Sequence, residues 1–158
     1  MPLSVGSAIP DLLRCSIDSS NEVTLRNQRS TVAYFWSISC PACKSNMPHL
    51  QKLRDDYATR GLQTVAIHMP RGDSELDETK VRAVATEIGV TETLILDNDH
   101  KISEAFGVNA VPAYFLFDSE GKLRRHALGN FGVRMIGEAA KRLFGDTEHA
   151  KESDAATP

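Results

Sequence analysis

The chain has 158 residues, 41% of them hydrophobic, which suits one domain able to bury a core without disulfide or metal staples. Its 18 lysines and arginines and 21 acidic residues give a formal net charge of −3, with no basic block along the sequence. This balance argues against nucleic acid or a membrane surface as a partner. The three cysteines do not make the disulfide framework of a small secreted protein.

The chain starts without a basic stretch followed by an apolar run, so the sequence predicts neither a signal peptide nor a membrane anchor. We therefore expect a cytoplasmic protein, and we expect it to be a monomer. Residues 1–14 are expected to be irregular, and residues 22–25 to form a short strand. Cys15 lies between them and is expected to be a small buried side chain.

The segment 31–37 is rich in β-branched and aromatic residues and runs directly into the motif Cys40-Pro41-Ala42-Cys43. Its composition predicts a central strand, and Pro41 suits the first turn of a following helix. The free N–H groups and positive dipole end of that helix would lie against the first sulfur and favour its thiolate. A free cysteine titrates near pH ~8.5, and such motifs bring this to roughly 3.5–7.5. The two cysteines share one helix face, so Cys43 can close a disulfide on Cys40.

A C-x-x-C motif can also be half of a zinc site. Structural zinc normally has four ligands, typically from a second C-x-x-C or from a histidine pair. Neither pattern is present, and Cys15, His49 and His68 could supply ligands only if folding brought them together. The motif therefore predicts redox chemistry, with no metal and no cofactor other than a redox-active Cys40–Cys43 disulfide.

The remaining elements alternate in type along the chain. A helix is predicted from Pro41 to about Arg60, with a core stripe at Met47, Leu50, Leu53 and Tyr57 and a stop at Gly61. The acidic segment 72–78 is expected to be a solvated connection. Further elements are predicted as strands at 62–69, 93–96, 113–117 and 122–127, and as helices at 79–88, 101–106 and 132–144, with a turn at 97–100 that caps the helix at 101–106.

This order predicts an α/β sandwich with a mixed sheet whose two central strands are parallel and buried. Residues 1–145 are expected to form a single domain. The polar residues 146–158 are expected to be a disordered tail.

The motif Phe35-Trp36-Ser-Ile-Ser-Cys40-Pro-Ala-Cys43, followed by Phe106-Gly-Val-Asn-Ala-Val111-Pro112-Ala-Tyr-Phe, resembles the thioredoxin-fold oxidoreductases. The helix and strand at 79–96 resemble the insertion of the TlpA/ResA-like branch. The segment Val65-Ala-Ile-His-Met-Pro-Arg71 looks most similar to the small cytoplasmic YkuV-type members of that branch. The resemblance implies a thioredoxin-like three-layer sandwich with a mixed central sheet, that insertion and an N-terminal extension.

The resemblance also implies roles for particular residues. Cys40 would be the nucleophile, Cys43 the resolving thiol, Trp36 a packing wall under the site, and Pro112 a cis-proline facing the disulfide. A cis-proline edge would leave Val111 free to pair with the extended backbone of a substrate, so Val111, Pro112 and Trp36 are the candidate substrate-binding residues. A trans proline that opens the strand at 113–117 is the simpler alternative.

Two positions depart from the family pattern. Tyr34 stands where thioredoxins have a buried carboxylate beneath the dithiol, and Asn46 stands where some ResA-like proteins have an acidic residue. The usual proton acceptor for Cys43 is therefore absent or replaced. His68 is the nearby side chain that titrates near neutrality, so it is the candidate for proton transfer, although a packed histidine at the end of a strand is a common alternative.

The sequence thus predicts a thiol–disulfide oxidoreductase that reduces protein disulfides through Cys40 and Cys43, recycled by a reductase such as a thioredoxin reductase-like protein. A peroxiredoxin-like thiol peroxidase is one alternative, although Ser37-Ile-Ser-Cys40 lacks the threonine of a peroxidatic loop. A non-catalytic thioredoxin-fold binding module is another.

Overall fold

The computed structural model describes residues 3–11 and 29–156. Its helices and strands are β1 (Thr31–Trp36), α2 (Pro41–Tyr57), β2 (Gln63–His68), α3 (Glu78–Ile88), β3 (Thr93–Leu96), α4 (Lys101–Phe106), β4 (Ala113–Phe117), β5 (Leu123–Leu128) and α5 (Gly132–Ala156). Short 3-10 turns, η1 (Ala58–Arg60) and η2 (Asp73–Leu76), follow α2 and β2. The strand expected at 22–25 and Cys15 lie outside the described residues.

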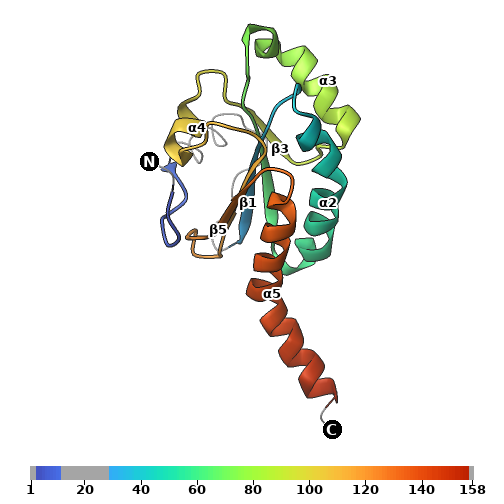
Figure 1. The fold of residues 1–158 in the computed structure, drawn as a ribbon. Coiled ribbons are helices and arrows are strands. Elements are labelled where there is room, and N and C mark those ends of the chain that lie inside the picture. The colour runs from blue at the N-terminus through green and yellow to red at the C-terminus, as the bar shows by residue number, and fades with distance from the viewer. Residues whose placement is uncertain (1–2, 12–28, 157–158) are drawn as a thin grey trace.

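The described strands form one five-stranded mixed sheet in the order β3-β2-β1-β4-β5 (Figure 1). β1 pairs with β2 in parallel, with Trp36 opposite His68, and pairs with β4 antiparallel, with Phe35 opposite Ala113. The carboxyl ends of β1 and β2 therefore meet at the same edge of the sheet where β4 begins. Every residue of β1 is buried, as its apolar composition predicts for a central strand.

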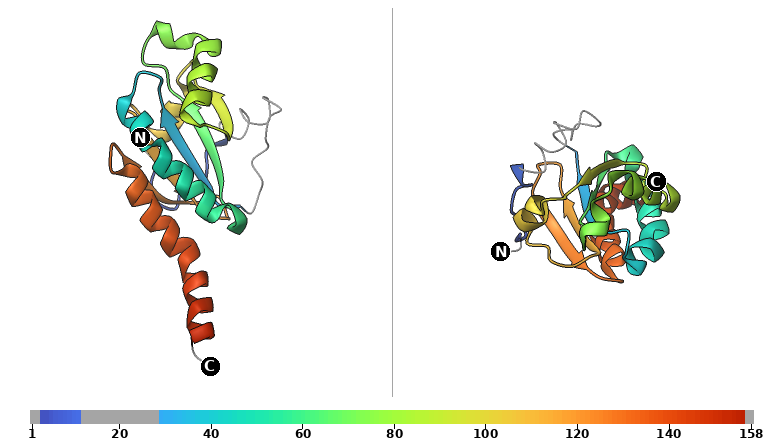
Figure 2. Two further views of the ribbon diagram at one scale, coloured as in Figure 1. Left: turned by 90° about the vertical axis from the view of Figure 1, so that its right-hand side faces the viewer. Right: turned by 90° about the horizontal axis from the view of Figure 1, so that it is seen from above.

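Helices cover both faces of the sheet and make three layers (Figures 1 and 2). On one face, side chains of α2, α3 and α5, among them Leu50, Val81 and Ile136, form a core that includes both cysteines of the motif. On the other face, Ile102 and Phe106 of α4 form a second core. The mixed three-layer α/β sandwich predicted from the sequence is confirmed.

Helix α2 begins at the motif as expected and ends at Tyr57, and the residues up to the expected stop at Gly61 form the 3-10 turn η1. Cys40 is its N-cap residue and Pro41 occupies the first turn, where a missing N–H costs no helical hydrogen bond. Gly61, with φ of 99°, ends the final 3-10 turn. Asp97 also confirms its predicted capping role, because its carboxylate accepts hydrogen bonds from the backbone N–H groups of Ile102 and Ser103 at 2.9 and 2.8 Å.

Two expectations need correction. Helix α5 continues to Ala156 instead of ending near Gly145, so residues 146–156 are helical where a disordered tail was expected. Glycine weakens a helix interior by only about 1 kcal/mol, and the following sequence is rich in alanine, lysine and glutamate, which favour helix. The acidic segment 72–78 is not wholly solvated, because Glu75 is only 5% exposed.

Candidate active site

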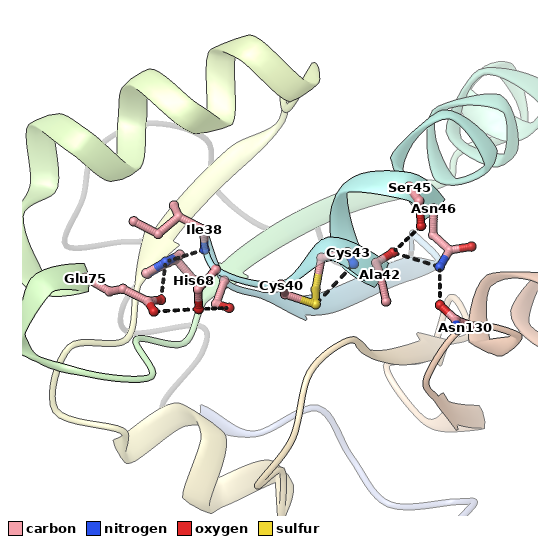
Figure 3. Close-up of a disulfide and its surroundings, with 11 residues drawn as sticks. Ile38, Cys40, Ala42, Cys43, Ser45, Asn46, His68, Glu75 and Asn130 are labelled. Atoms are coloured by element: carbon pink, nitrogen blue, oxygen red, sulfur yellow. Dashed lines mark hydrogen bonds and ion pairs between the residues drawn. A yellow bond between two sulfur atoms is a disulfide. The ribbon is translucent and has the colours of Figure 1, made fainter.

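The dithiol lies where β1 passes into α2. Cys40 has an extended backbone (φ −103°, ψ 103°), and its Sγ accepts a hydrogen bond from the backbone N–H of Cys43 at 3.1 Å. The two residues form a disulfide with their Cα atoms 5.3 Å apart (Figure 3). Both cysteines are buried, while Ser39 and Pro41 on either side of Cys40 are exposed. The pair therefore lies just beneath the surface, at a point that an extended chain could approach.

The electrostatic setting of Cys40 comes from the start of the helix. The first turn of α2 contains no acidic residue, so no side chain there competes with the sulfur for the helix N–H groups. A sulfur that accepts one of these N–H groups gains most when it is negatively charged. This arrangement suits a cysteine that reacts as a thiolate.

Val111 and Pro112 lie at the same sheet edge as the dithiol. The peptide bond between them is cis. Since Ala113 pairs with Phe35 in the ladder, Pro112 lies level with Trp36 at the end of β1. The Pro112 carbonyl accepts a hydrogen bond from the N–H of Gly129 at 2.9 Å, which fixes this edge to the turn before α5.

Trp36 is almost fully buried and belongs to the same core as the two cysteines. Its ring meets the ring of His68 edge-on, with centroids 5.0 Å apart. The indole N–H has no hydrogen-bond partner within the described residues. Trp36 thus lies in the same hydrophobic core as Cys40 and Cys43 and packs against His68.

His68 is fully buried at the end of β2, on the strand beside Trp36. Its Nε2 accepts a hydrogen bond from the backbone N–H of Ile38 at 3.3 Å and lies 3.6 Å from Oε1 of Glu75. Burial lowers the pKa of His68 to about 4, and the nearby Glu75 carboxylate partly opposes this shift. At neutral pH the imidazole is therefore uncharged and acts as a hydrogen-bond acceptor.

Glu75 is a polar residue of this region that the sequence analysis missed. Its Oε2 accepts a hydrogen bond from the hydroxyl of Ser39 at 2.6 Å, and its side chain is 7% exposed. Glu75 stands among the exposed residues Asp73, Asp77 and Glu78, so its sequence context suggested a solvated loop. Its one distinguishing signal is its position between Gly72 and Leu76, in a segment that must pass close to the end of β2.

The two positions that depart from the family pattern have other partners. The side-chain amide of Asn46 donates to the Ala42 carbonyl at 2.8 Å and to Oδ1 of Asn130 at 3.4 Å (Figure 3). Tyr34 donates its hydroxyl to Glu92. Burial, together with Glu92, holds the pKa of Tyr34 well above its ordinary value, so this phenol stays protonated. Neither residue places a carboxylate next to Cys43 in the way the family pattern would.

Glu92 lies just before β3, and it accepts hydrogen bonds from other side chains in addition to Tyr34. Its other carboxylate oxygen accepts from Nη1 of Arg54 at 2.9 Å and from the hydroxyl of Thr64 at 3.2 Å. The charge of this carboxylate is thus paired with a cation and hydrogen-bonded on both oxygens.

The described residues contain no group of three or more histidine, cysteine or acidic side chains that could hold a metal ion. Within the same part of the chain, no helix combines the length and apolar character needed to cross a bilayer.

Residues 5–126 match the model of the AhpC/TSA family. The thiol-disulfide oxidoreductase YkuV of Bacillus subtilis (strain 168) is 39% identical over 132 residues, covering 82% of this chain and 88% of that protein. The thiol-disulfide oxidoreductase ResA of Geobacillus thermodenitrificans (strain NG80-2) is 26% identical over 128 residues, covering 80% of this chain and 71% of that protein.

A solved structure agrees with these matches. The solution structure of a thioredoxin-like protein in the oxidized form superposes with a TM-score of 0.77 and 34% identity, over 91% of this chain and 99% of that one. The matches extend well beyond the C-x-x-C motif and include the inserted helix and strand. The chain therefore belongs to the AhpC/TSA family, and within it is a TlpA/ResA-like thiol–disulfide oxidoreductase of the thioredoxin fold.

Proposed function

We propose that this thiol–disulfide oxidoreductase reduces disulfides in cytoplasmic proteins, with Cys40 as nucleophile and Cys43 as resolving thiol. The observation that supports these roles is the position of the Cys40 sulfur, which caps α2 and accepts the Cys43 N–H at 3.1 Å. Cys43 lies within α2, with its Cα 5.3 Å from that of Cys40, so its thiol can reach the Cys40 sulfur.

The proposed reaction has two exchange steps. The Cys40 thiolate attacks one sulfur of the substrate disulfide, forming a mixed disulfide and releasing the other substrate sulfur as a thiolate that takes a proton. Cys43 then loses its proton and attacks Cys40, which breaks the mixed disulfide and releases the second substrate thiol. The substrate gains two electrons and two protons, and the Cys40–Cys43 disulfide remains. An external dithiol protein, such as a thioredoxin reductase-like enzyme, must then reduce that disulfide.

Val111, Pro112 and Trp36 are the proposed substrate-binding residues. Val111 precedes β4, so its backbone lies beyond the sheet pairing that begins at Ala113. An extended substrate segment can pair with this edge and bring its disulfide over Cys40. Trp36 supports the site from beneath.

Proton transfer by His68 stays a prediction. The pKa of about 4 leaves its imidazole neutral at pH 7 but makes it a weaker base than an ordinary histidine, and Nε2 already accepts the N–H of Ile38. The Nδ1 atom has no hydrogen-bond partner within the described residues, so a water-mediated path from Cys43 would have to use that side of the ring.

The direction of the reaction follows from what stabilises the reduced form. Any group that stabilises the thiolate makes the disulfide more oxidising, and each ~30 mV corresponds to about 1.4 kcal/mol. Helix-end stabilisation without a histidine between the cysteines should place the potential nearer the thioredoxin value of about −270 mV than the strongly oxidising value near −120 mV. Equilibration of the Cys40/Cys43 pair with glutathione or dithiothreitol measures it. A potential above roughly −200 mV would indicate a disulfide-forming catalyst instead.

Insulin reduction, followed by turbidity, tests the activity. Wild-type protein with a recycling dithiol should turn over, Cys40→Ser should be inactive, and Cys43→Ser should accumulate a mixed disulfide on Cys40. An adduct on Cys43 would reverse the assigned roles. Peroxide consumption without insulin reduction would support the peroxidase alternative, and neither activity would support a binding module.

The partners and compartment can be tested with the same variant. Mixed disulfides trapped in cells by Cys43→Ser should join Cys40 to cytoplasmic substrate proteins. Adducts with exported proteins alone would refute the proposed compartment. Sedimentation of the reduced and oxidised protein should give a monomer in both states.

A further inference from the structure

Glu75 is a buried carboxylate in a segment whose other acidic residues are exposed. It is 5% exposed, whereas Asp73 on the same 3-10 turn is solvent-exposed. Burying a carboxylate is costly unless it is hydrogen-bonded or paired, so a buried Glu75 is expected to accept a hydrogen bond from a neighbouring group.

That partner is the turn that leads into the dithiol. The Ser39 hydroxyl donates to Glu75 Oε2 at 2.6 Å, a short hydrogen bond to a charged acceptor. Ser39 immediately precedes Cys40, and its side chain is otherwise on the exposed side of the turn. The hydrogen bond therefore holds the residue next to the nucleophile against η2.

His68 provides a second anchor on the same turn. Its Nε2 accepts the backbone N–H of Ile38, and the same atom faces Glu75 Oε1 at 3.6 Å (Figure 3). Two consecutive residues of the turn, Ile38 and Ser39, are thus tied to two buried titratable groups that contact each other. Cys40 itself continues the turn, with its N–H donating to the Ser37 carbonyl at 3.2 Å.

We propose that Glu75 is a positioning residue for Cys40: by holding Ser39, it keeps the turn oriented so that the Cys40 sulfur lies over the first N–H groups of α2. The proposal concerns the thiol–disulfide exchange of this same site and rests on that activity. The sulfur accepts the Cys43 N–H only while Cys40 keeps its extended N-cap backbone, and that backbone follows directly from the anchored turn.

The negative charge of Glu75, taken alone, would affect the Cys40 thiolate in the opposite direction to the anchoring of Ser39. A negative carboxylate near Cys40 disfavours a second negative charge on the sulfur, so removing the charge alone should favour the thiolate. Loss of the anchor should instead move the sulfur off the helix N–H groups and disfavour the thiolate. The two effects can therefore be separated by variants that remove the charge and the hydrogen bond independently.

The test measures the alkylation rate of Cys40 in the reduced full-length protein against pH, with iodoacetamide as probe and mass spectrometry of the Cys40 peptide as readout. Glu75→Ala and Ser39→Ala should each raise the midpoint by about 0.5 to 1 pH unit, which is about a 3- to 10-fold loss of thiolate below the midpoint. Glu75→Gln should have a midpoint at or below that of wild type, because its amide oxygen can still accept the Ser39 hydroxyl while the negative charge is lost. Asp73→Ala removes an exposed carboxylate of the same turn and is the matched control.

The double variant Ser39→Ala/Glu75→Ala completes the design. If Glu75 acts through Ser39, the double variant should shift no further than either single variant. Additive shifts, a midpoint raised by Glu75→Gln as far as by Glu75→Ala, or unchanged midpoints in both alanine variants would overturn the proposal. If Glu75→Ala does not fold, Ser39→Ala and Glu75→Gln still decide the question.

Insulin reduction by the wild-type protein, measured in parallel, reports on the exchange activity itself. Its absence would count against the reductase function, whereas the alkylation midpoints would still report whether Glu75 positions the sulfur.

Discussion

Protonation of His68 should make the stability of this protein depend on pH in a defined interval. His68 is fully buried, and burial lowers its pKa from 6.5 to about 4 in the folded state. The unfolded chain therefore binds more protons than the folded chain between these two values. The free energy that neutral, buried His68 adds to unfolding is fully present above pH 6.5 and is lost progressively as the pH falls toward 4.

The magnitude follows from the same interval. Each pH unit between 6.5 and about 4 corresponds to about 1.4 kcal/mol, so the full effect is about 3 kcal/mol, of which about 2 kcal/mol should be lost by pH 5. This is a large part of the free energy of unfolding of a typical domain, which is roughly 5–15 kcal/mol. Protonation would also convert Nε2 from an acceptor of the Ile38 N–H into a donor, which breaks that anchor.

Urea unfolding at pH 7, 6 and 5 measures the effect, with the fluorescence of Trp36, the only tryptophan of the chain, as the signal and the disulfide kept oxidised. His68→Gln is the comparison, because its amide oxygen can accept the Ile38 N–H but does not titrate. His49→Gln removes an exposed histidine of α2 and should keep the wild-type pH dependence. If wild type and His68→Gln lost equal stability between pH 7 and 5, the reasoning would be refuted.

Three further variants test the packing around the site, each by its urea midpoint at pH 7. Tyr34→Phe removes the donor to the Glu92 carboxylate and should cost about 1–3 kcal/mol; no loss would show that Glu92 finds another donor. Asp97→Ala removes the cap of α4 and should cost about 2 kcal/mol, with the loss accompanied by faster proteolysis of that helix. Gly132→Ala would place a Cβ 2.5 Å from the ring of Tyr114 and should cost about 1–3 kcal/mol, and a neutral result would mean that the ring can move.

Elements whose hydrophobic pattern has one clear period could be predicted from the sequence. The strands at 93–96 and 113–117 and the helix at 101–106 have the predicted bounds, because short apolar runs there are bounded by turn residues. The order of elements then determined the layered α/β class. Helix α5 was predicted too short because Gly145 was given the weight of a stop signal, although its surroundings favour helix.

The polar contacts around the dithiol could not be predicted in the same way. Periodicity identifies buried apolar side chains, but a buried carboxylate such as Glu75 looks like any other residue of an acidic loop until the fold brings Ser39 beside it. The same holds for Glu92, whose partners Tyr34 and Arg54 lie 58 and 38 residues away. Such pairs depend on long-range packing, which one sequence does not encode in any local pattern.

The inserted segment between β2 and β4 has a consequence for transplanting the dithiol between scaffolds. Two carboxylates of this segment hold it to the region of the dithiol: Glu75 in η2 accepts the hydroxyl of Ser39, in the turn before α2, and Glu92, just before β3, accepts the hydroxyl of Tyr34 on β1. Trimming the chain to a minimal thioredoxin core would remove the acidic neighbours of the Ser39 hydroxyl, of the buried Tyr34 hydroxyl and of the buried His68 ring at once. The insertion is thus an integral support of this domain, and a graft of the C-x-x-C loop would have to carry the insertion's carboxylates with it.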